Sequence, residues 1–304
     1  MGTRWRVCLV AGARVELQPL HDAVQATLDL VVAQMSTWEA DSDITRYNRA
    51  EAGSWQVLPR PFFDVLRCAL EVAEASGGAY DPTIGPLVDL WGFGAGSRGH
   101  RIPEADEIEA ARARTGWRKL ALRDAPPAAL QAGNVALDVS AIAKGHGVDA
   151  VVTRLRDEGI AGALVDVGGE LAGYGRKPDG APWRVLVETS PEADDADPCV
   201  LSLDGSAVAT SGVRWHRFEH DGRSYAHTLD PRSGAPVEDA AAAVTVVADD
   251  AMHADAWATA LTVMGVDEGF TFAQARGLAA RFVPGSTDAG DVRMTAAFAE
   301  RTAS

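Results

Sequence analysis

The feature that most constrains the fold is the alternation of two hydrophobic periods along a chain of 304 residues that has no internal repeat and no extended linker. Apolar residues recur at helical spacing in residues 17–35 and 61–75, which predicts two amphipathic helices. Residues 163–167 and 244–247 are short runs that are apolar except for Asp166 and Thr245, as in buried strands. Helices and strands that alternate without a linker favour one compact α+β unit.

Turn signals mark two strand pairings in the second half of the chain. Residues 217–229 are predicted to form a hairpin around Asp221 and Gly222, because this dipeptide supplies the positive φ angles of a two-residue turn. Near the end of the chain, we expect residues 279–283 and 294–298 to pair as the last two strands.

The charge balance excludes several classes of partner. With 47% hydrophobic and 23% charged residues, the chain has the composition of a globular protein with a sizeable core. Asp and Glu outnumber Lys and Arg by 43 to 28, and the resulting net charge of -15 repels nucleic acid and anionic membrane surfaces. A phosphate-binding site must therefore be local or built around a metal ion.

The cysteines and the apolar segments indicate the compartment. Cys8, Cys68 and Cys199 are scattered without CxxC spacing, which is typical of small core residues in a reducing compartment. No stretch reaches the roughly 18 apolar residues of a membrane-spanning helix, and the N-terminus lacks an apolar leader segment. We expect a cytoplasmic protein without a membrane span, and export of a longer precursor is left open.

A candidate metal site lies on a helix predicted over residues 251–264. Asp255 and Thr259 are four residues apart and so project from one face of this helix. Carboxylate and hydroxyl oxygens suit Mg²⁺ or Ca²⁺ and do not suit zinc. The helix is apolar on nearly all sides, so Asp255 is expected to be buried and to need a partner. A solvated face or a local side-chain hydrogen bond would give the same spacing.

A candidate phosphate site lies in residues 137–149, with the sequence LDVSAIAKGHGVD. A strand is predicted to end at Asp138, and a helix is predicted from Gly145 onward. The start of a helix presents free N–H groups to an anion, and Lys144 adds a full positive charge. The alternative is a solvent-exposed lysine beside turn glycines, and the segment does not match a P-loop.

Residues 77–94 form a third candidate segment, with the sequence GGAYDPTIGPLVDLWGFG. Its glycines and prolines predict a rigid, ordered loop. Tyr80, Trp91 and Phe93 could offer a flat apolar wall to an aromatic ligand, or they could simply be buried in a packed loop.

His227 is the fourth candidate, on a hairpin strand that precedes a turn built on Asp230, Pro231 and Gly234. An imidazole can accept a proton near neutral pH, so His227 is a candidate base. A structural role for a single histidine on a strand is the alternative.

Taken together and in this order, these segments resemble the ApbE family, the FAD:protein FMN transferases. The resemblance extends over nearly the whole chain, and eight blocks keep the order and spacing of the family. The blocks are MGT at residues 1–3, MSTWEADSDITRYN at 35–48, GAYDPTIGPLVDLWGFG at 78–94, LDVSAIAKG at 137–145, VGGE at 167–170, AVATSG at 207–212, HTLDPRSG at 227–234 and DAWATAL at 255–261.

The resemblance implies a single compact ApbE-like (T-fold-like) α+β domain over residues 1–304, with a mainly antiparallel sheet packed by helices. It implies a metal site, here expected to hold Mg²⁺, made by the backbone carbonyl of Ala141 and the side chains of Asp255 and Thr259. Trp38 stands where the family usually has Tyr, which keeps a stacking face and removes a hydroxyl. Contacts with FAD are implied at Met1, Trp38, Ala79, Tyr80, Asp81, Asp138, Lys144, His227 and Leu229.

The implied reaction cleaves the pyrophosphate of FAD, transfers FMN to a Thr or Ser hydroxyl of an acceptor flavoprotein and releases AMP. The metal bound by Asp255, together with Lys144, would neutralise the pyrophosphate oxygens. His227 would accept the proton of the hydroxyl, with Asp230 and Asp81 as alternatives. Catalytic roles are thus implied for His227, Lys144 and Asp255.

Two other functions remain open at this point. In an FAD pyrophosphatase, water replaces the protein hydroxyl and the products are free FMN and AMP. The aromatic residue at position 38 favours transfer, because members that resemble the hydrolase carry a small amide there. The second alternative is a flavin-binding or flavin-storing protein without turnover, in which Asp255 and Thr259 would have no role as metal ligands.

Overall fold

The computed structural model describes residues 2–12, 15–187, 199–212, 217–237, 243–285 and 291–302. The chain divides into two compact units, each of which is described by itself. Such a unit can be part of a larger domain, so a single domain over residues 1–304 stays a prediction. The first unit contains Met1–Asp29, Lys144–Gly212 and Ala240–Ser304, and the second contains Leu30–Ala143 and Val213–Asp239.

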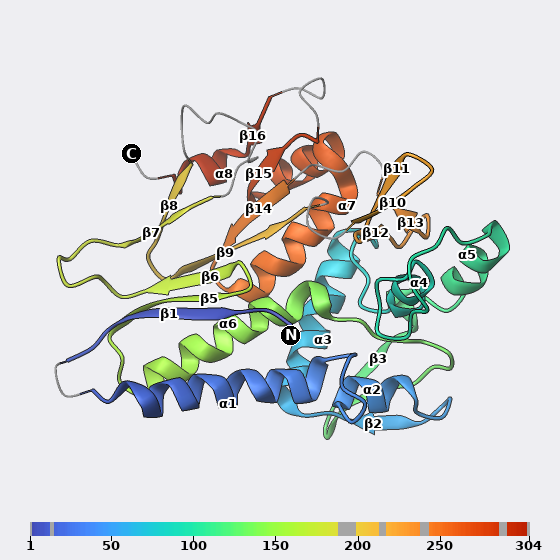
Figure 1. Ribbon diagram of the computed structural model, residues 1–304, viewed down its shortest axis with the longest axis horizontal. Coiled ribbons are helices and arrows are strands. Elements are labelled where there is room, and N and C mark those ends of the chain that lie inside the picture. Colours follow the sequence, from blue (N-terminus) through green and yellow to red (C-terminus); the bar gives the residue numbers. More distant parts are fainter. Residues whose placement is uncertain are drawn as a thin grey trace. The chain divides into compact units, whose positions relative to one another are not determined.

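The first unit is built on a seven-stranded sheet in which every neighbouring pair is antiparallel (Figure 1). This arrangement confirms the α+β class with a mainly antiparallel sheet and the strands predicted at residues 163–167 and 244–247. A separate pair, β7 (Trp183–Leu186) and β8 (Val200–Leu203), is also antiparallel. In sheet order, the seven strands are β1 (Trp5–Val10), β5 (Gly162–Val167), β6 (Glu170–Tyr174), β9 (Ser206–Ser211), β14 (Ala243–Ala248), β15 (Ala279–Val283) and β16 (Arg293–Met294).

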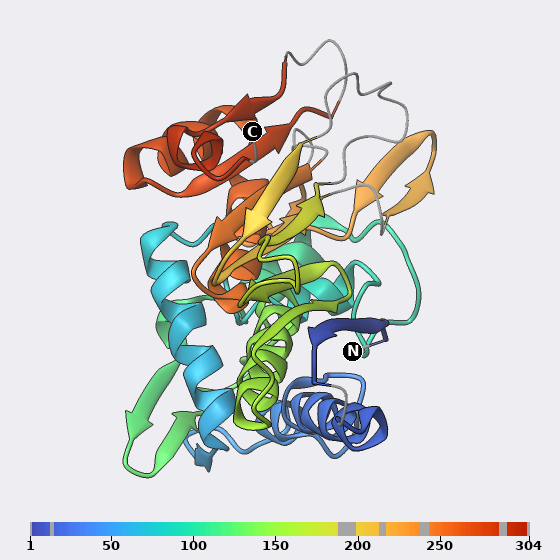
Figure 2. The ribbon, with the colours of Figure 1, turned by 90° about the vertical axis from the view of Figure 1, so that its left-hand side faces the viewer.

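Both faces of this sheet are covered, which explains why its strands carry apolar residues at successive positions. Successive side chains of a strand point to opposite faces. In β5, Val165 packs with residues of α1 (Leu17–Met35) and α6 (Ser140–Asp157), whereas Leu164 packs in a second cluster with residues of β7 and β8. The two helices lie on the same side of β1 and β5 (Figure 1 and Figure 2). Helix α7 (Ala251–Arg276) packs on β9 and β14.

The end of the chain differs from the prediction. Only Arg293 and Met294 pair with β15, and the following residues form α8 (Ala296–Ala299). The side chain of Thr295 accepts a hydrogen bond from the Phe298 N–H and so caps this short helix, and the Phe298 ring is fully buried. The predicted strand at residues 294–298 was therefore wrong beyond Met294, because a local cap and a buried ring decide the conformation.

The second unit contains short sheets and most of the short helices. The predicted hairpin is confirmed: Asp221 and Gly222, with φ angles of 50° and 75°, form the turn between β10 (Arg217–His220) and β11 (Arg223–Ala226). The other elements are the sheet of β2 (Trp55–Val57), β4 (Pro127–Leu130) and β3 (Ala121–Asp124), the pair of β12 (Leu229–Asp230) and β13 (Ala235–Pro236), and the helices α2 (Asp43–Asn48), α3 (Arg60–Ala75), α4 (Gly85–Leu90), α5 (Ala105–Arg112) and η1 (Trp117–Lys119).

The aromatic segment at residues 77–94 includes helix α4 and is packed into this second unit. Trp91 is 3% exposed, its ring stacks on Tyr225 at 5.9 Å between centroids, and its indole N–H donates to the Gly234 carbonyl at 2.9 Å. Tyr80 is equally buried. The interpretation as a packed loop is thus correct for Trp91 and Tyr80, and neither ring forms an open wall.

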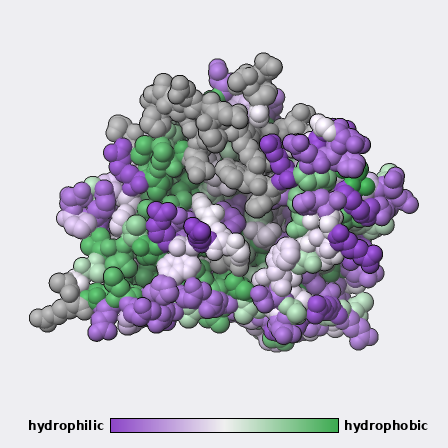
Figure 3. Space-filling view, viewed as in Figure 1, coloured by the Kyte–Doolittle hydropathy of each residue, from purple (hydrophilic) through white to green (hydrophobic). Residues whose placement is uncertain are grey.

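The surface follows the composition. Hydrophilic residues cover much of the face in Figure 3, and hydrophobic residues gather at its left, where β1 and β6 lie in Figure 1. In the part of the chain that the structure describes, no helix combines the length and the apolar character needed to span a membrane.

Candidate functional site

The most distinctive cluster of charges in the first unit is formed by Lys144, Glu170 and Asp255. The Lys144 ammonium forms an ion pair with Glu170 Oε1 and interacts electrostatically with Asp255. Glu170 is only 2% exposed and Asp255 only 5%, so both carboxylates are withdrawn from water, whereas the Lys144 side chain is 32% exposed. Burial of charge is costly unless the charges are paired, and here the lysine is the common partner of both acids.

Close backbone packing between α6 and α7 brings these residues together. The Gly145 N–H donates to Asp255 Oδ2 at 3.0 Å across 110 residues of sequence. A Cβ atom at Gly145 would lie 2.6 Å from the Ala251 carbonyl carbon and 2.9 Å from Asp255 Cβ. Only glycine permits this approach. The glycine was expected to let a ligand approach the backbone, and in the structure it lets helix α7 approach instead.

The pKa shifts follow from burial and from mutual charge. Burial raises the pKa of the Asp255 carboxyl, with Lys144 acting in the opposite direction. Burial, then the negative charge of Asp255, raise the pKa of Glu170 to about 8. For Lys144, burial lowers the pKa, but Asp255 and Glu170 outweigh it, and the net shift is upward. Two carboxyl groups thus share one ammonium group, and a bound cation would supply further positive charge.

Thr259 lies one turn after Asp255 on α7 and is partly buried. The structure therefore confirms that both residues belong to one helix. Among the described residues, no group of three or more His, Cys, Asp or Glu side chains is placed to hold a metal ion. A metal here would need hydroxyl and main-chain oxygens beside Asp255, which is the ligand chemistry of a hard cation such as Mg²⁺.

The predicted main-chain ligand, Ala141, lies at a kink in α6. Its φ and ψ angles of -89° and 17° are not helical, whereas the helix continues on both sides. Asp138 precedes the helix, and its Oδ1 accepts a hydrogen bond from the Ser140 N–H at 2.8 Å. The helix thus begins at Ser140, five residues before the predicted start, and the boundary between the two units passes through it after Ala143.

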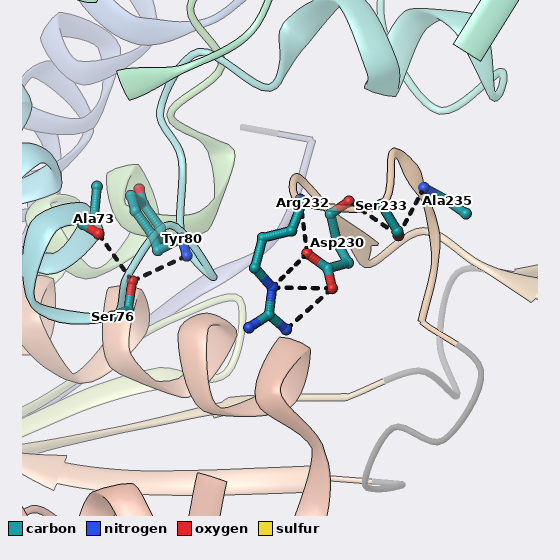
Figure 4. A network of polar contacts seen from close by, with 7 residues as sticks. All are labelled: Ala73, Ser76, Tyr80, Asp230, Arg232, Ser233 and Ala235. Carbon is teal, nitrogen blue, oxygen red and sulfur yellow. Dashed lines mark hydrogen bonds and ion pairs between the residues drawn. The ribbon is translucent and has the colours of Figure 1, made fainter. Parts of the chain in front are cut away.

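In the second unit, hydrogen bonds to neighbouring residues hold the predicted flavin-contact segment, residues 79–81, in place. Asp81 Oδ1 accepts hydrogen bonds from the N–H and hydroxyl of Thr83 at 2.8 and 2.7 Å, and Oδ2 accepts from the Trp117 N–H at 3.0 Å. Burial raises the pKa of Asp81 despite these donors. The Tyr80 N–H donates to Ser76 Oγ at 3.2 Å (Figure 4), and Ala79 is buried beside it. The Asp81 side chain is therefore committed to internal bonds.

A polar cavity of about 310 Å³ adjoins this segment within the second unit. Its lining includes Gly78 and Trp117, the acidic residues Asp81 and Glu109, and the arginines Arg112, Arg118 and Arg232. Arg112 and Arg232 are ion-paired with Glu109 and Asp230, so this cavity offers a phosphate group little free positive charge.

The remaining predicted residues of the second unit differ in accessibility. Trp38 is 72% exposed, His227 is partly buried with Phe93 edge-on to its ring at 6.4 Å, and Leu229 is buried. Asp230 accepts hydrogen bonds from the Arg232 guanidinium at 3.0 and 3.1 Å (Figure 4). Met1 lies outside the described residues.

Sequence reasoning missed Glu170. Its block, VGGE, contributed to the resemblance, but no role followed from it, because a glutamate after two glycines is also an ordinary strand start. In the structure Gly168 and Gly169, with φ angles of 68° and 103°, reverse the chain and place Glu170 at the first position of β6. Its proximity to Lys144 across 26 residues is a tertiary contact.

Fold and charges together define a class: an α+β protein with an antiparallel sheet and a cluster in which two buried carboxylates share one lysine. The chain matches the ApbE family over residues 1–282, and it belongs to that family. This confirms the resemblance that the eight sequence blocks indicated.

Individual relatives agree over nearly the full length. An FAD:protein FMN transferase of Klebsiella pneumoniae is 33% identical over 290 residues, covering 92% of this chain and 81% of the relative. One from Escherichia coli is 31% identical, covering 98% and 86%. The crystal structure of the Pseudomonas stutzeri flavinyl transferase ApbE, in its apo form, has a TM-score of 0.90 at 39% identity, covering 98% of this chain and 92% of that one. The flavin transferase ApbE of Vibrio cholerae has a TM-score of 0.90 at 30% identity, covering 99% and 96%.

Proposed function

We propose that this protein is an FAD:protein FMN transferase, which transfers FMN from FAD to a Thr or Ser hydroxyl of an acceptor flavoprotein and releases AMP. The observation that carries the proposal is the buried centre of Lys144, Glu170 and Asp255 in a chain that matches the ApbE family over residues 1–282. The similar proteins from Klebsiella pneumoniae and Escherichia coli bear this transferase name, which supports the same substrate here.

Asp255, Thr259 and the Ala141 carbonyl are the groups that would hold Mg²⁺. Asp255 fits this role because its carboxyl is buried, and burial raises its pKa against the opposing effect of Lys144, so a further cation would stabilise the ionised form. Thr259 fits because its hydroxyl follows one turn later on the same helix. When bound, the ion supplies positive charge that stabilises the pyrophosphate oxygens during phosphoryl transfer.

The chain's own charges and surfaces bind the rest of the dinucleotide. Lys144 provides a fixed ammonium for the pyrophosphate, since its upward-shifted pKa keeps it protonated at neutral pH. The segment of Ala79, Tyr80 and Asp81 offers a backbone that internal hydrogen bonds already hold in place. Trp38 offers an exposed ring on which a flavin or adenine ring could stack.

In the transfer step, the acceptor hydroxyl oxygen forms a bond to the FMN phosphorus while the bond from that phosphorus to the AMP oxygen breaks. The proton of the hydroxyl moves to the His227 imidazole, and AMP departs with the electron pair. His227 is preferred because an imidazole accepts a proton near neutral pH. The two alternatives are the Asp81 carboxylate, which accepts three hydrogen bonds, and the Asp230 carboxylate, which is bound by Arg232.

Incubation with FAD, Mg²⁺ and candidate flavoproteins tests the function, with mass spectrometry of the acceptor and quantification of AMP. Added FMN on Thr or Ser, with AMP formed only when acceptor is present, supports transfer. AMP formed without acceptor would identify a pyrophosphatase, and neither product would indicate flavin storage. A cytoplasmic location belongs to the same proposal, and the scattered positions of the three cysteines, without CxxC spacing, support it.

A further inference from the structure

Glu170 has one carboxylate oxygen that the described part of the chain leaves without a hydrogen bond. Oε1 is paired with Lys144, whereas Oε2 is fully buried and no described residue donates to it. Buried carboxylate oxygens are nearly always satisfied, because an unsatisfied one loses its hydration without compensation. This oxygen is therefore suited to a proton donor that arrives with a ligand.

The neighbours of Glu170 indicate which ligand brings that donor. Glu170 and Asp255, the predicted metal ligand, both interact with the Lys144 ammonium. The negative charge of Asp255 also acts on the Glu170 carboxyl. With all three groups ionised, the centre carries a net charge of -1. Such a centre attracts a dication and opposes an anion. Mg²⁺ retains several of its waters in proteins, and each of these waters is a hydrogen-bond donor.

We propose that Glu170 is a positioning residue of the metal centre: its Oε1 holds the Lys144 ammonium beside Asp255, and its Oε2 accepts a hydrogen bond from a water of the bound dication. The proposal rests on the proposed function, since it assigns a role within the same site. Lysine has a flexible four-carbon stem, so a fixed carboxylate keeps its charge in one place. Outer carboxylates of this kind orient the shell of a metal without binding it directly.

The proposal predicts that Glu170→Gln affects the affinities for Mg²⁺ and for FAD differently. Glu170→Gln removes one negative charge, and because its amide oxygen faces the Lys144 ammonium, an NH₂ donor replaces the Oε2 acceptor. Mg²⁺ binding should therefore weaken by about 10- to 100-fold. The same change leaves Lys144 with one carboxylate partner fewer, so FAD binding without metal is unchanged or tighter. A purely structural ion pair would weaken both ligands together, because its loss disorders the site.

The experiment is a titration of the full-length protein with Mg²⁺ by calorimetry, and with FAD by fluorescence in the absence of metal. Both titrations are done at the same pH and ionic strength for all proteins. The variants are E170Q, K144M and the double variant. Lys144→Met removes the positive charge, so it should tighten Mg²⁺ binding and weaken FAD binding.

The double variant provides a second measurement in case E170Q alone does not fold. Replacing both members of a buried pair is often tolerated where breaking the pair is not. Relative to K144M, the double variant should bind Mg²⁺ about 10-fold more weakly. Equal Mg²⁺ affinity in these two proteins, parallel losses for Mg²⁺ and FAD in E170Q, or no Mg²⁺ binding by the wild type would each overturn the proposal. Absence of an FMN adduct with the wild type, by contrast, refutes the proposed function and leaves the Mg²⁺ affinities as a separate result.

Discussion

Gly145→Ala gives the sharpest test of how the centre is assembled. The added Cβ would lie 2.6 Å from the Ala251 carbonyl carbon and 2.9 Å from Asp255 Cβ, and closer still to the Ala251 carbonyl oxygen. Ordinary contacts to carbon begin near about 3.5 Å, so α6 and the first turn of α7 must separate by roughly 1 Å. Both partners of the clash are backbone or Cβ atoms, so no side-chain rotation relieves it.

Two effects of Gly145→Ala lower the free energy of unfolding, and one effect raises it. Overpacking of this kind costs about 1–3 kcal/mol, and weakening of the hydrogen bond from the Gly145 N–H to the buried Asp255 adds about 1–3 kcal/mol. The better helix propensity of alanine returns about 1 kcal/mol. The net loss is therefore about 1–5 kcal/mol, with a midpoint of about 3 kcal/mol, and at about 2–4 °C per kcal/mol the midpoint corresponds to a fall in Tm of roughly 6–12 °C.

Thermal unfolding followed by circular dichroism measures this loss. Gly12→Ala is the matched control, because its Cβ would have no atom within 4 Å and its φ is not in the left-handed region. The control should melt within about 2 °C of the wild type. If Gly145→Ala melts with the control, the close approach of α6 and α7 is not as described, and the placement of Asp255 against Gly145 is refuted.

Three further predictions concern single side chains. Asp255→Ala should abolish Mg²⁺-dependent AMP release, measured by chromatography, and full activity would remove the metal assignment. His227→Ala should slow FMN transfer by about 10²- to 10⁴-fold while FAD affinity, measured by fluorescence, stays within about threefold, and an unchanged transfer rate would exclude His227 as the base. Burial raises the pKa of Asp149 from 3.8 to about 6, so its stabilising contribution is complete below pH 3.8 and is lost as the pH rises through 6. Asp149→Asn should therefore reduce the fall in unfolding free energy between pH 4 and pH 7 by up to about 3 kcal/mol in urea titrations, and an identical pH profile would contradict this assignment.

Local patterns were enough to predict much of the fold. The helix at residues 17–35 and the strand at residues 163–167 follow from hydrophobic periodicity, which depends only on neighbouring residues. The hairpin at Asp221 and Gly222 follows from the φ angles that this dipeptide adopts. The strand predicted at residues 294–298 failed because a cap and a buried ring, neither evident in the apolar pattern, turned most of it into a helix.

Residue types and spacing were enough to predict a candidate site, whereas its surroundings became visible only in the folded chain. The helical spacing of Asp255 and Thr259 is local, so the hard-oxygen pair could be predicted from residue types alone. The ion pair of Lys144 with Glu170 and the bond from Gly145 to Asp255 join residues 26 and 110 positions apart. Such contacts depend on how the strands and helices pack, and no local pattern specifies that packing. Only the folded chain could show that the lysine offered to phosphate is held between two buried carboxylates.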